Sequence, residues 1–265
     1  MSLEGYEGFD ITVDGFVAEI TFNRPEVFNR FDALMHREFT RALEVLRRDT
    51  ELRAVVLAST GKVFSAGGDF DYMLDMHANL STRLRGVDEG RLLFETLIDL
   101  PMPVIVALHA DAIGLGASVV LACDAVVAAR TAGLADPHVA VGLVAGDGGC
   151  VAWPLAAGML RAKRYLLTGE RIGAEAGYAM GLVTDLVDEP AEVLPAARAL
   201  AQRIASLPPL AVQGTKRALN HIVQQRADEV LKLSFALEAH SIASEDLVEA
   251  VSAFKEKREP KYQGR

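Results

Sequence analysis

Short apolar segments alternate with longer mixed segments through the first half of this sequence. Residues 53–58 and 103–108 are almost entirely apolar, residues 125–129 form a similar run, and Val17–Phe22 alternates apolar and polar side chains. Continuous apolar runs of this length are typical of parallel strands buried on both faces, and the intervening segments are long enough for helices. The pattern predicts an α/β fold around a parallel sheet, with Asp32 as the N-cap of the first helix.

The second half of the chain is predicted to be mainly helical, with one late strand over residues 182–187. The polar stretch 71–90 shows no clean apolar period, so we expect a mobile or irregular helical lid there. The Pro208–Pro209 pair marks the expected boundary between a core, residues 1–207, and a C-terminal helical part, residues 208–265. The helices expected in this half cover residues 161–167, 174–180, 192–206, 211–225 and 228–257.

The composition restricts the classes of function. Of the 265 residues 51% are apolar, which is enough to bury a substantial core in one main domain. A net charge of −9 argues against nucleic-acid binding, which needs clustered cations to neutralise phosphates. Cys123 and Cys150 lack the spacing of a metal site and are expected to be buried free thiols in a reducing compartment.

Targeting and membrane signals are not apparent in the sequence. The N-terminal residues lack a basic segment followed by an apolar one, and no run of about 18 apolar residues occurs. We therefore expect a cytoplasmic protein with no membrane partner.

Two glycine-bearing segments follow apolar strands. Residues 64–69 are Phe-Ser-Ala-Gly-Gly-Asp, and residues 113–117 are Ile-Gly-Leu-Gly-Ala. Because glycine has no Cβ, backbone N–H groups in such loops can approach a ligand closely, and two loops on one cleft could direct two N–H groups at one oxygen. The alternative for each segment is a tight strand-to-helix turn. A dinucleotide-binding loop is disfavoured, because that motif needs a small residue where this chain has Val119.

Five motifs in a set order carry a resemblance to a known family. They are VVLAS with FSAGGDF, PMPVIVALHADAIGLGASVVLACDAVVAA, DPHVAVGLVAGDGG, AKRYLLTGERIGAEAGYAMGLVTDLV and AFKEKREPKY. Together they cover roughly residues 10–260 and resemble the crotonase family of enoyl-CoA hydratases and isomerases. The resemblance implies a spiral of ββα units and a C-terminal helical region used in oligomerisation, in a homotrimer or a hexamer built as a dimer of trimers. It also implies an acyl-CoA thioester substrate, with no metal and no cofactor beyond the CoA moiety.

The resemblance assigns an oxyanion hole by position. The family holds the thioester oxygen with two backbone N–H groups while an enolate forms, and the matching residues here are Gly68 and Leu115. Loss of one such donor typically costs about 10²–10³ in rate. The expected catalytic framework therefore uses main-chain groups of the two glycine-bearing segments.

Further residues are assigned to substrate binding by the same matching. Ala66 is expected to contact the adenine through its backbone, and Gly67 and Gly116 to lie beside the substrate. Phe254 and Lys257, on the last helix, match positions where the family contacts CoA. The alternative for Lys257 is a solvated charge on an exposed helix.

The sequence departs from the family at both acid–base positions. Hydratases of the family use two glutamates, and this chain has Ser118 and His138 there. A positioned acid or base contributes roughly 10²–10⁴ in rate, so other groups must act if hydration occurs. His138, with an ordinary pKa of about 6.5, could move a proton near neutrality. Asp147, one position from the acidic residue of some isomerases, and Asp111 are further candidates, whereas Asp69 is expected to cap a helix.

Structural interpretations of these groups remain open. His138 could only form a hydrogen bond beside its proline, Asp147 could only stabilise a glycine-rich turn, and Asp111 could be an ordinary loop residue. Ser118 could hold a water molecule near the substrate, but it is no base at neutral pH without a partner.

The expected function is hydration of a 2-enoyl-CoA through a stabilised enolate. His138 or Asp147 would move the protons, and Gly68 and Leu115 would hold the oxyanion. Enoyl-CoA isomerisation, acyl-CoA hydrolysis and decarboxylation remain open, because they use the same oxyanion hole. A non-catalytic acyl-CoA-binding protein is the alternative from another class, and the loss of both glutamates favours it.

Overall fold

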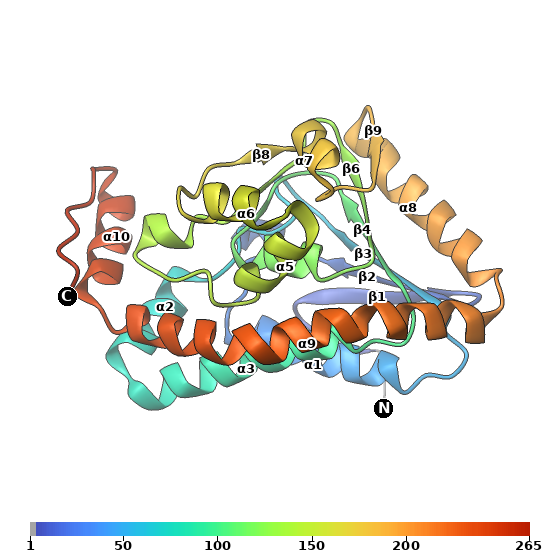
Figure 1. The fold of residues 1–265 in the computed structure, drawn as a ribbon, viewed down its shortest axis with the longest axis horizontal. Helices are drawn as coiled ribbons and strands as arrows, with labels where there is room; N and C mark the ends of the chain where they lie inside the picture. Colours follow the sequence, from blue (N-terminus) through green and yellow to red (C-terminus); the bar gives the residue numbers. More distant parts are fainter. Residues whose placement is uncertain (1–3) are drawn as a thin grey trace.

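The computed structural model describes residues 4–265 and confirms the expected α/β architecture. A six-stranded sheet has the strand order β1-β2-β3-β4-β6-β9 (Figure 1). All neighbouring pairs are parallel except β1 and β2, which form an antiparallel hairpin. The strands are β1 (Phe9–Asp14), β2 (Val17–Phe22), β3 (Ala54–Ser59), β4 (Val104–Leu108), β6 (Ala125–Ala129) and β9 (Asp185–Val187).

A second, three-stranded sheet has the order β5-β7-β8. Its strands are short: β5 (Ala112–Ile113), β7 (Gly133–Ala135) and β8 (Ile172–Gly173). None of the three was expected from the sequence, because two- or three-residue strands carry no readable alternation. This small sheet matters for function, since β5 leads into the second glycine-bearing segment and β7 leads into the segment that contains His138.

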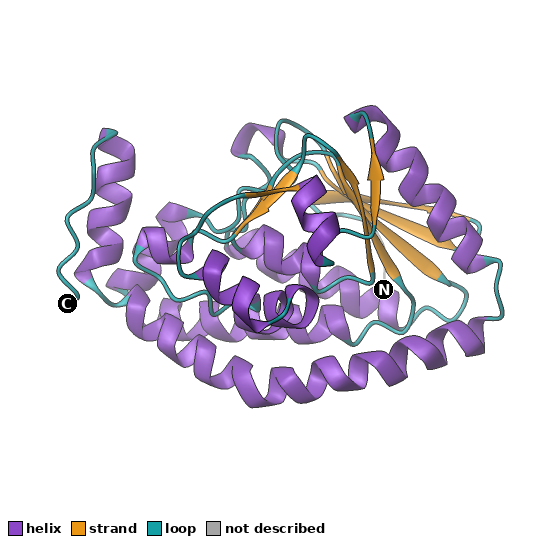
Figure 2. Cartoon of the chain, turned by 45° about the horizontal axis from the view of Figure 1, so that its top comes forward, coloured by secondary structure: helices purple, strands orange, loops and turns teal. Residues whose placement is uncertain are grey.

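Helices surround the larger sheet (Figure 2). In chain order they are α1 (Ala33–Arg47), α2 (Phe70–Ala78), α3 (Leu80–Ile98), α4 (Leu115–Leu121), α5 (Gly149–Ala157), α6 (Met159–Leu166), α7 (Ala174–Met180), α8 (Pro190–Ala205), α9 (Pro209–Ile242) and α10 (Glu245–Glu256), with short 3-10 turns at Pro25–Val27 and His138–Val141. The Asp32 carboxylate accepts a hydrogen bond from the Met35 N–H, which confirms the predicted N-cap of α1. An aromatic cluster then joins α1 to the hairpin, with Phe39 edge-on to both Phe9 and Phe22.

Two helical predictions were wrong. The stretch 71–90 is not irregular, because α2 and α3 are regular helices with side-chain N-caps at Asp69 and Asn79. The apolar period was missed because the buried residues of α3 are concentrated in its last turns, after a polar beginning. The two helices expected over 211–225 and 228–257 are instead one 34-residue helix, α9, and a separate α10.

The long helix α9 packs along α3 and α5 (Figure 1). Its side chains Ala227, Leu231 and Phe235 join Phe94 of α3 and Val151 of α5 in a second apolar cluster beside the main core. The C-terminal helices are therefore in direct contact with the rest of the chain. Within residues 4–265 no helix combines the length and the apolar character needed to cross a bilayer.

Candidate active site

The two glycine-bearing loops lie side by side at the ends of β3 and β4. The Ile113 N–H donates to the Ser65 carbonyl at 3.0 Å. On its other side the first loop pairs with Phe31, whose N–H donates to the Gly67 carbonyl at 2.7 Å and whose carbonyl accepts from the Asp69 N–H at 3.2 Å. Successive backbone groups of an extended segment point to opposite sides, so the Gly68 N–H points away from Phe31.

Two glycines make this close approach possible. Gly67 has a φ of +81°, and a Cβ on it would lie 2.5 Å from the Ile113 carbonyl oxygen. A Cβ on Gly116 would lie 2.8 Å from the Ser65 Cβ. Both distances are shorter than side chains tolerate, so glycine is required at each position. The structure thus gives Gly67 and Gly116 a packing role, and their predicted contact with substrate stays a prediction.

Gly68 and Leu115 lie at one cavity. Both residues line a small cavity of about 50 Å³ between the two loops, α2, α3 and α9. Leu115 is the first residue of α4, so its N–H has no partner within that helix. Across residues 4–265 neither N–H donates to a protein acceptor. The arrangement provides two free donors, as an oxyanion hole needs, and the role of Gly68 and Leu115 as that hole remains a prediction.

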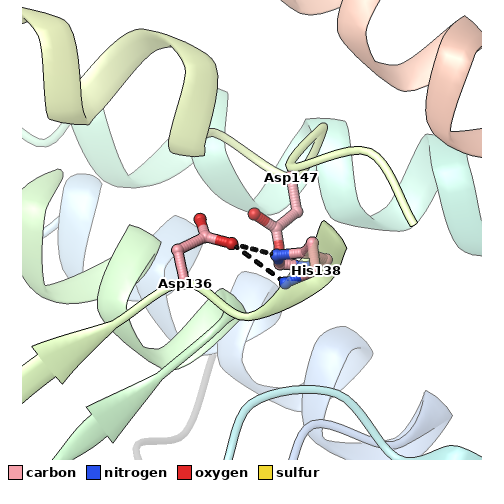
Figure 3. Close-up of side chains that lie close together, drawn as sticks. All are labelled: Asp136, His138 and Asp147. Atoms are coloured by element: carbon pink, nitrogen blue, oxygen red, sulfur yellow. Dashed lines mark hydrogen bonds and ion pairs between the residues drawn. The ribbon is translucent and has the colours of Figure 1, made fainter. Parts of the chain in front are cut away.

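His138 lies between two buried carboxylates (Figure 3). It begins the turn that follows β7, and its Nδ1 is 2.5 Å from Oδ1 of Asp136. Its Nε2 is 3.1 Å from Oδ2 of Asp147, which comes from the loop before α5. The Ser118 hydroxyl of α4 donates to the other oxygen of Asp147 at 2.8 Å. Two of the residues predicted from sequence, His138 and Asp147, are therefore in contact at the cavity. Ser118 forms a hydrogen bond to the Asp147 carboxylate.

The charges of this group keep His138 protonated. Burial alone would lower the pKa of His138, but the carboxylates of Asp147 and Asp136 raise it well above its ordinary value. Burial tends to raise the pKa of Asp147, but the His138 cation and the Ser118 hydroxyl lower it overall. At neutral pH the group is therefore an imidazolium between two carboxylates. This changes the expectation for His138, which is an acid in the resting state rather than a base with an ordinary pKa.

Asp136 was missed by the sequence analysis, although it lies only two residues before His138. Its Oδ2 has no hydrogen-bond partner in the described chain and would be 2.5 Å from a Cβ on Gly149. The ligand atoms of Asp136, His138 and Asp147 lie within 4.8 Å of one another, a spacing that could suit a metal ion. Because an imidazolium has no free lone pair, a metal ion would have to displace the proton that the two carboxylates favour on His138.

Glu238 and His36 are further titratable residues that line the cavity. Glu238 comes from α9, and only 8% of its surface is exposed. Burial and the charge of Asp147 raise the pKa of Glu238 to about 8. His36, on α1, has a pKa lowered by burial, and its Nδ1 is 2.9 Å from the Asp32 carbonyl oxygen, which can only accept. His36 Nδ1 is therefore the protonated nitrogen, and Nε2 carries the lone pair.

A sequence signal for Glu238 exists in retrospect. In the segment SFALEAHSI, Phe235 and Ile242 lie three residues before and four residues after it. These spacings place a carboxyl on an otherwise apolar helix face. A buried carboxyl on such a face is unusual without a functional or pairing role. His36 has no comparable signal, because a single histidine in an amphipathic helix is common.

The residues expected to contact CoA lie outside the cavity. Ala66 is half-buried and its N–H donates to the Phe28 carbonyl, which leaves only its carbonyl for a ligand. Phe254 of α10 is exposed and packs edge-on against Phe70, the first residue of α2, with ring centres 5.1 Å apart. Lys257 is exposed at the end of α10. Phe254 thus lies near the first glycine loop, and the assignment of all three residues to CoA stays a prediction.

Asp69 and Asp111, the two remaining aspartates considered in the sequence analysis, have structural roles. Asp69 caps α2 by accepting from the Tyr72 N–H at 2.7 Å, as predicted. Asp111 does not face the cavity, so its candidacy as an acid or base was wrong. Its carboxylate instead accepts two hydrogen bonds from Arg171, at 2.6 and 2.7 Å.

Comparisons with known proteins find similar proteins over nearly the whole chain. Residues 12–265 match the family described as enoyl-CoA hydratase/isomerase. The chain is 32% identical to the short-chain-enoyl-CoA hydratase of Clostridium acetobutylicum, over 92% of this chain and 93% of that protein. A crystal structure of an enoyl-CoA hydratase/isomerase from Mycobacterium paratuberculosis has a TM-score of 0.89 and 38% identity, covering 92% of this chain and 97% of that one.

A second similar structure belongs to a protein with a different activity. It is a β-diketone hydrolase from the cyanobacterium Anabaena bound to (S)-3-oxocyclohexyl acetic acid, with a TM-score of 0.83 and 28% identity. The match covers 90% of this chain and 95% of the hydrolase. These likenesses confirm the crotonase-type α/β fold predicted from the five motifs. The chain belongs to the enoyl-CoA hydratase/isomerase family.

Proposed function

We propose that this protein adds water to an acyl-CoA thioester through an enolate, and that its first candidate reaction is hydration of a 2-enoyl-CoA. One observation carries the proposal: Gly68 and Leu115, whose backbone N–H groups have no acceptor within residues 4–265, line the same cavity as the His138–Asp147 pair. The similar hydratases named above support the choice of reaction. Donors aimed at a developing oxyanion are commonly the largest single contribution to this type of catalysis.

The side chains present can supply both proton transfers of hydration. Asp147 accepts a proton from water while the water oxygen bonds to C3 of the enoyl group. The electron pair of the double bond moves to the thioester oxygen, which the N–H groups of Gly68 and Leu115 stabilise. The His138 imidazolium then gives its proton to C2, and the proton held by Asp147 returns to His138 across the 3.1 Å contact. Water is thereby added across the double bond and the acid–base pair is regenerated.

The test is turnover of a short 2-enoyl-CoA, followed by loss of its conjugated absorbance. We expect Asp147→Asn and His138→Gln to lower kcat by about 10²–10⁴, because each removes a positioned acid or base. His221→Gln is the matched control, since His221 is an exposed histidine on α9. Wild-type turnover in both site variants would contradict the assigned roles.

A second candidate is hydrolysis of a carbon–carbon bond in a 3-oxoacyl-CoA. Two observations favour it. The two glutamate positions hold Ser118 and His138, and the His138 imidazolium lies between Asp136 and Asp147. The β-diketone hydrolase described above has a similar structure. Water would attack C3, the C2–C3 bond would break, and its electron pair would form the thioester enolate, which takes a proton at C2. The products are a carboxylic acid and a shortened acyl-CoA.

Product analysis separates the remaining possibilities. Hydration adds the mass of water, carbon–carbon hydrolysis gives two acyl products, and thioester hydrolysis releases free CoA. Decarboxylation of a malonyl-type thioester releases carbon dioxide, and isomerisation moves a double bond at constant mass. Tight binding of these thioesters with no turnover of any of them would leave the non-catalytic binding protein as the function.

The outer surface of α9 supports a homo-oligomer. Several of its large apolar side chains are exposed: Leu210, Leu219, Ile222, Leu233 and Leu237. Of these, Leu219, Ile222, Leu233 and Leu237 share one face of the helix by their spacing, and exposed apolar surface of this kind is typical of protein–protein interfaces. Light scattering on the purified protein would distinguish the expected trimer or hexamer from a monomer.

A further inference from the structure

Two carboxyls that line the cavity are not used by the reactions above, and of these Asp69 caps α2 whereas Glu238 has no such structural role. Glu238 comes from the last turns of α9 and lines the same cavity as Gly68, Leu115 and His138. Its Oε2 is buried and has no hydrogen-bond partner within residues 4–265. A buried, unpaired carboxyl oxygen is costly, so such a group commonly meets a ligand or a water molecule.

The packing around Glu238 leaves it little freedom. A Cβ on Gly146 would lie 2.5 Å from Oε2 and 2.7 Å from the Cβ of Glu238. The glycine therefore lets the carboxyl sit against the loop that carries Asp147. Ser234, one helical turn earlier, donates its hydroxyl to the Gly146 carbonyl at 2.9 Å and holds the loop against α9. The carboxyl is thus fixed beside the acid–base pair.

Burial and the neighbouring charges favour the neutral form of Glu238. Burial is the largest cause; Asp147 adds to it, the His138 cation acts against it, and Asp136 again disfavours a further negative charge. The pKa of about 8 means that Glu238 is a carboxylic acid at neutral pH and can donate a hydrogen bond. Other titratable groups near or across the cavity are Asp69 before α2, Cys150 of α5, His36 of α1, Tyr72 and His77 of α2, and Glu89 of α3.

We propose that Glu238 determines substrate specificity by donating a hydrogen bond to an oxygen at C3 of the acyl group. The proposal rests on the proposed function for the placement of the thioester. Because a 2-enoyl-CoA has no oxygen at C3, this contact favours the 3-oxoacyl-CoA of the carbon–carbon hydrolysis, and in hydration it forms only with the 3-hydroxyacyl product. An unsubstituted acyl chain leaves the buried carboxyl without a partner. The other walls of the cavity are largely apolar, including Met73, Met76, Val87 and Phe235, so they favour the hydrocarbon part of the substrate.

Binding of two thioethers tests this without any turnover. S-(3-oxobutyl)-CoA and S-butyl-CoA differ at C3, and neither has the thioester carbonyl that hydration or carbon–carbon hydrolysis requires. At about pH 6.5 we expect the oxo thioether to bind the wild type about tenfold more tightly, as one added hydrogen bond allows. At about pH 9, above the Glu238 pKa of about 8, this preference should fall to about twofold because the carboxylate has no proton to donate.

Three variants identify the group responsible. Glu238→Gln keeps an N–H donor of similar shape, so it should keep the preference at both pH values. Glu238→Leu should bind the two thioethers equally, and Glu229→Gln, an exposed position on the same helix, should behave as the wild type. Equal binding of the two thioethers by wild type, or a preference in Glu238→Leu as large as in wild type, would overturn the proposal. Because no reaction occurs, these outcomes do not depend on whether the enzyme proves to be a hydratase.

Discussion

Replacement of Gly67 by alanine tests whether loop packing positions the Gly68 N–H. Gly67 has a φ of +81°, and the new Cβ would lie 2.5 Å from the Ile113 carbonyl oxygen. A left-handed backbone costs a residue with a side chain about 1–2 kcal/mol. An added carbon in a packed interior costs about 1–3 kcal/mol. The expected loss in free energy of unfolding is therefore about 2–5 kcal/mol.

Gly15→Ala is a control that separates backbone strain from the steric clash. Gly15, in the β1–β2 hairpin, also has a positive φ, +57°, but a Cβ there meets no atom within 4 Å. The free energy of unfolding of Gly15→Ala should fall only by the cost of the left-handed backbone, about 1–2 kcal/mol. Urea unfolding of the two variants and the wild type measures the difference.

The activity of the same variants tests the oxyanion hole. The clash must move the loop by several tenths of an ångström, so in Gly67→Ala the Gly68 N–H loses its alignment with the thioester oxygen. We expect kcat to fall by about 10²-fold in Gly67→Ala, the cost of losing one oxyanion donor, and to stay at the wild-type value in Gly15→Ala. Equal stability losses in the two variants, with normal turnover by Gly67→Ala, would refute the reasoning.

Four further predictions concern polar and charged side chains. Ser118→Ala removes a hydrogen bond to the Asp147 carboxylate and should lower kcat about tenfold, as steady-state kinetics would show. Asp136→Asn removes one charge that raises the pKa of His138, so an NMR titration of the ring should find a lower pKa. The pKa of His138 is raised in the folded state, so protonated His138 stabilises the fold fully below the unfolded pKa of about 6.5, and this contribution disappears as pH rises through the folded pKa. The free energy of unfolding of the wild type should therefore fall as pH rises above neutrality. In urea unfolding, His138→Gln should show a smaller fall over the same pH range. Asp111→Asn should keep the wild-type kcat, since its carboxylate pairs outside the cavity.

The oxyanion framework was predictable because it depends on short-range features. Glycines after apolar strands, with spacing matched to a family, were enough to propose Gly68 and Leu115, and the structure brings both to one cavity. Asp69 was predicted as a helix cap for the same reason, since capping involves residues only three positions apart. The long helix α9 was divided in error, although residues 225–228 contain neither glycine nor proline to interrupt it.

The acid–base groups were only partly predictable. His138 and Asp147 could be proposed from one glycine-rich stretch, but their mutual contact requires the chain to fold back between β7 and α5. Glu238 reaches the same cavity from a helix 100 residues further along the chain than His138. No local pattern encodes such a meeting, because it depends on how α9 packs against α3 and α5.

The sequence by itself determined the α/β class and the family, and it was enough to propose Gly68 and Leu115 as main-chain oxyanion donors, because strand patterns and glycine positions act over a few residues. Only the tertiary structure decided the protonation states. The ordinary pKa of about 6.5 made His138 look like a base at neutral pH. Two carboxylates within hydrogen-bonding distance make it a cation, and the same negative charges, in a buried setting, keep Glu238 neutral. Charge interactions depend on distance in space and on burial, and the position of a residue in the chain specifies neither.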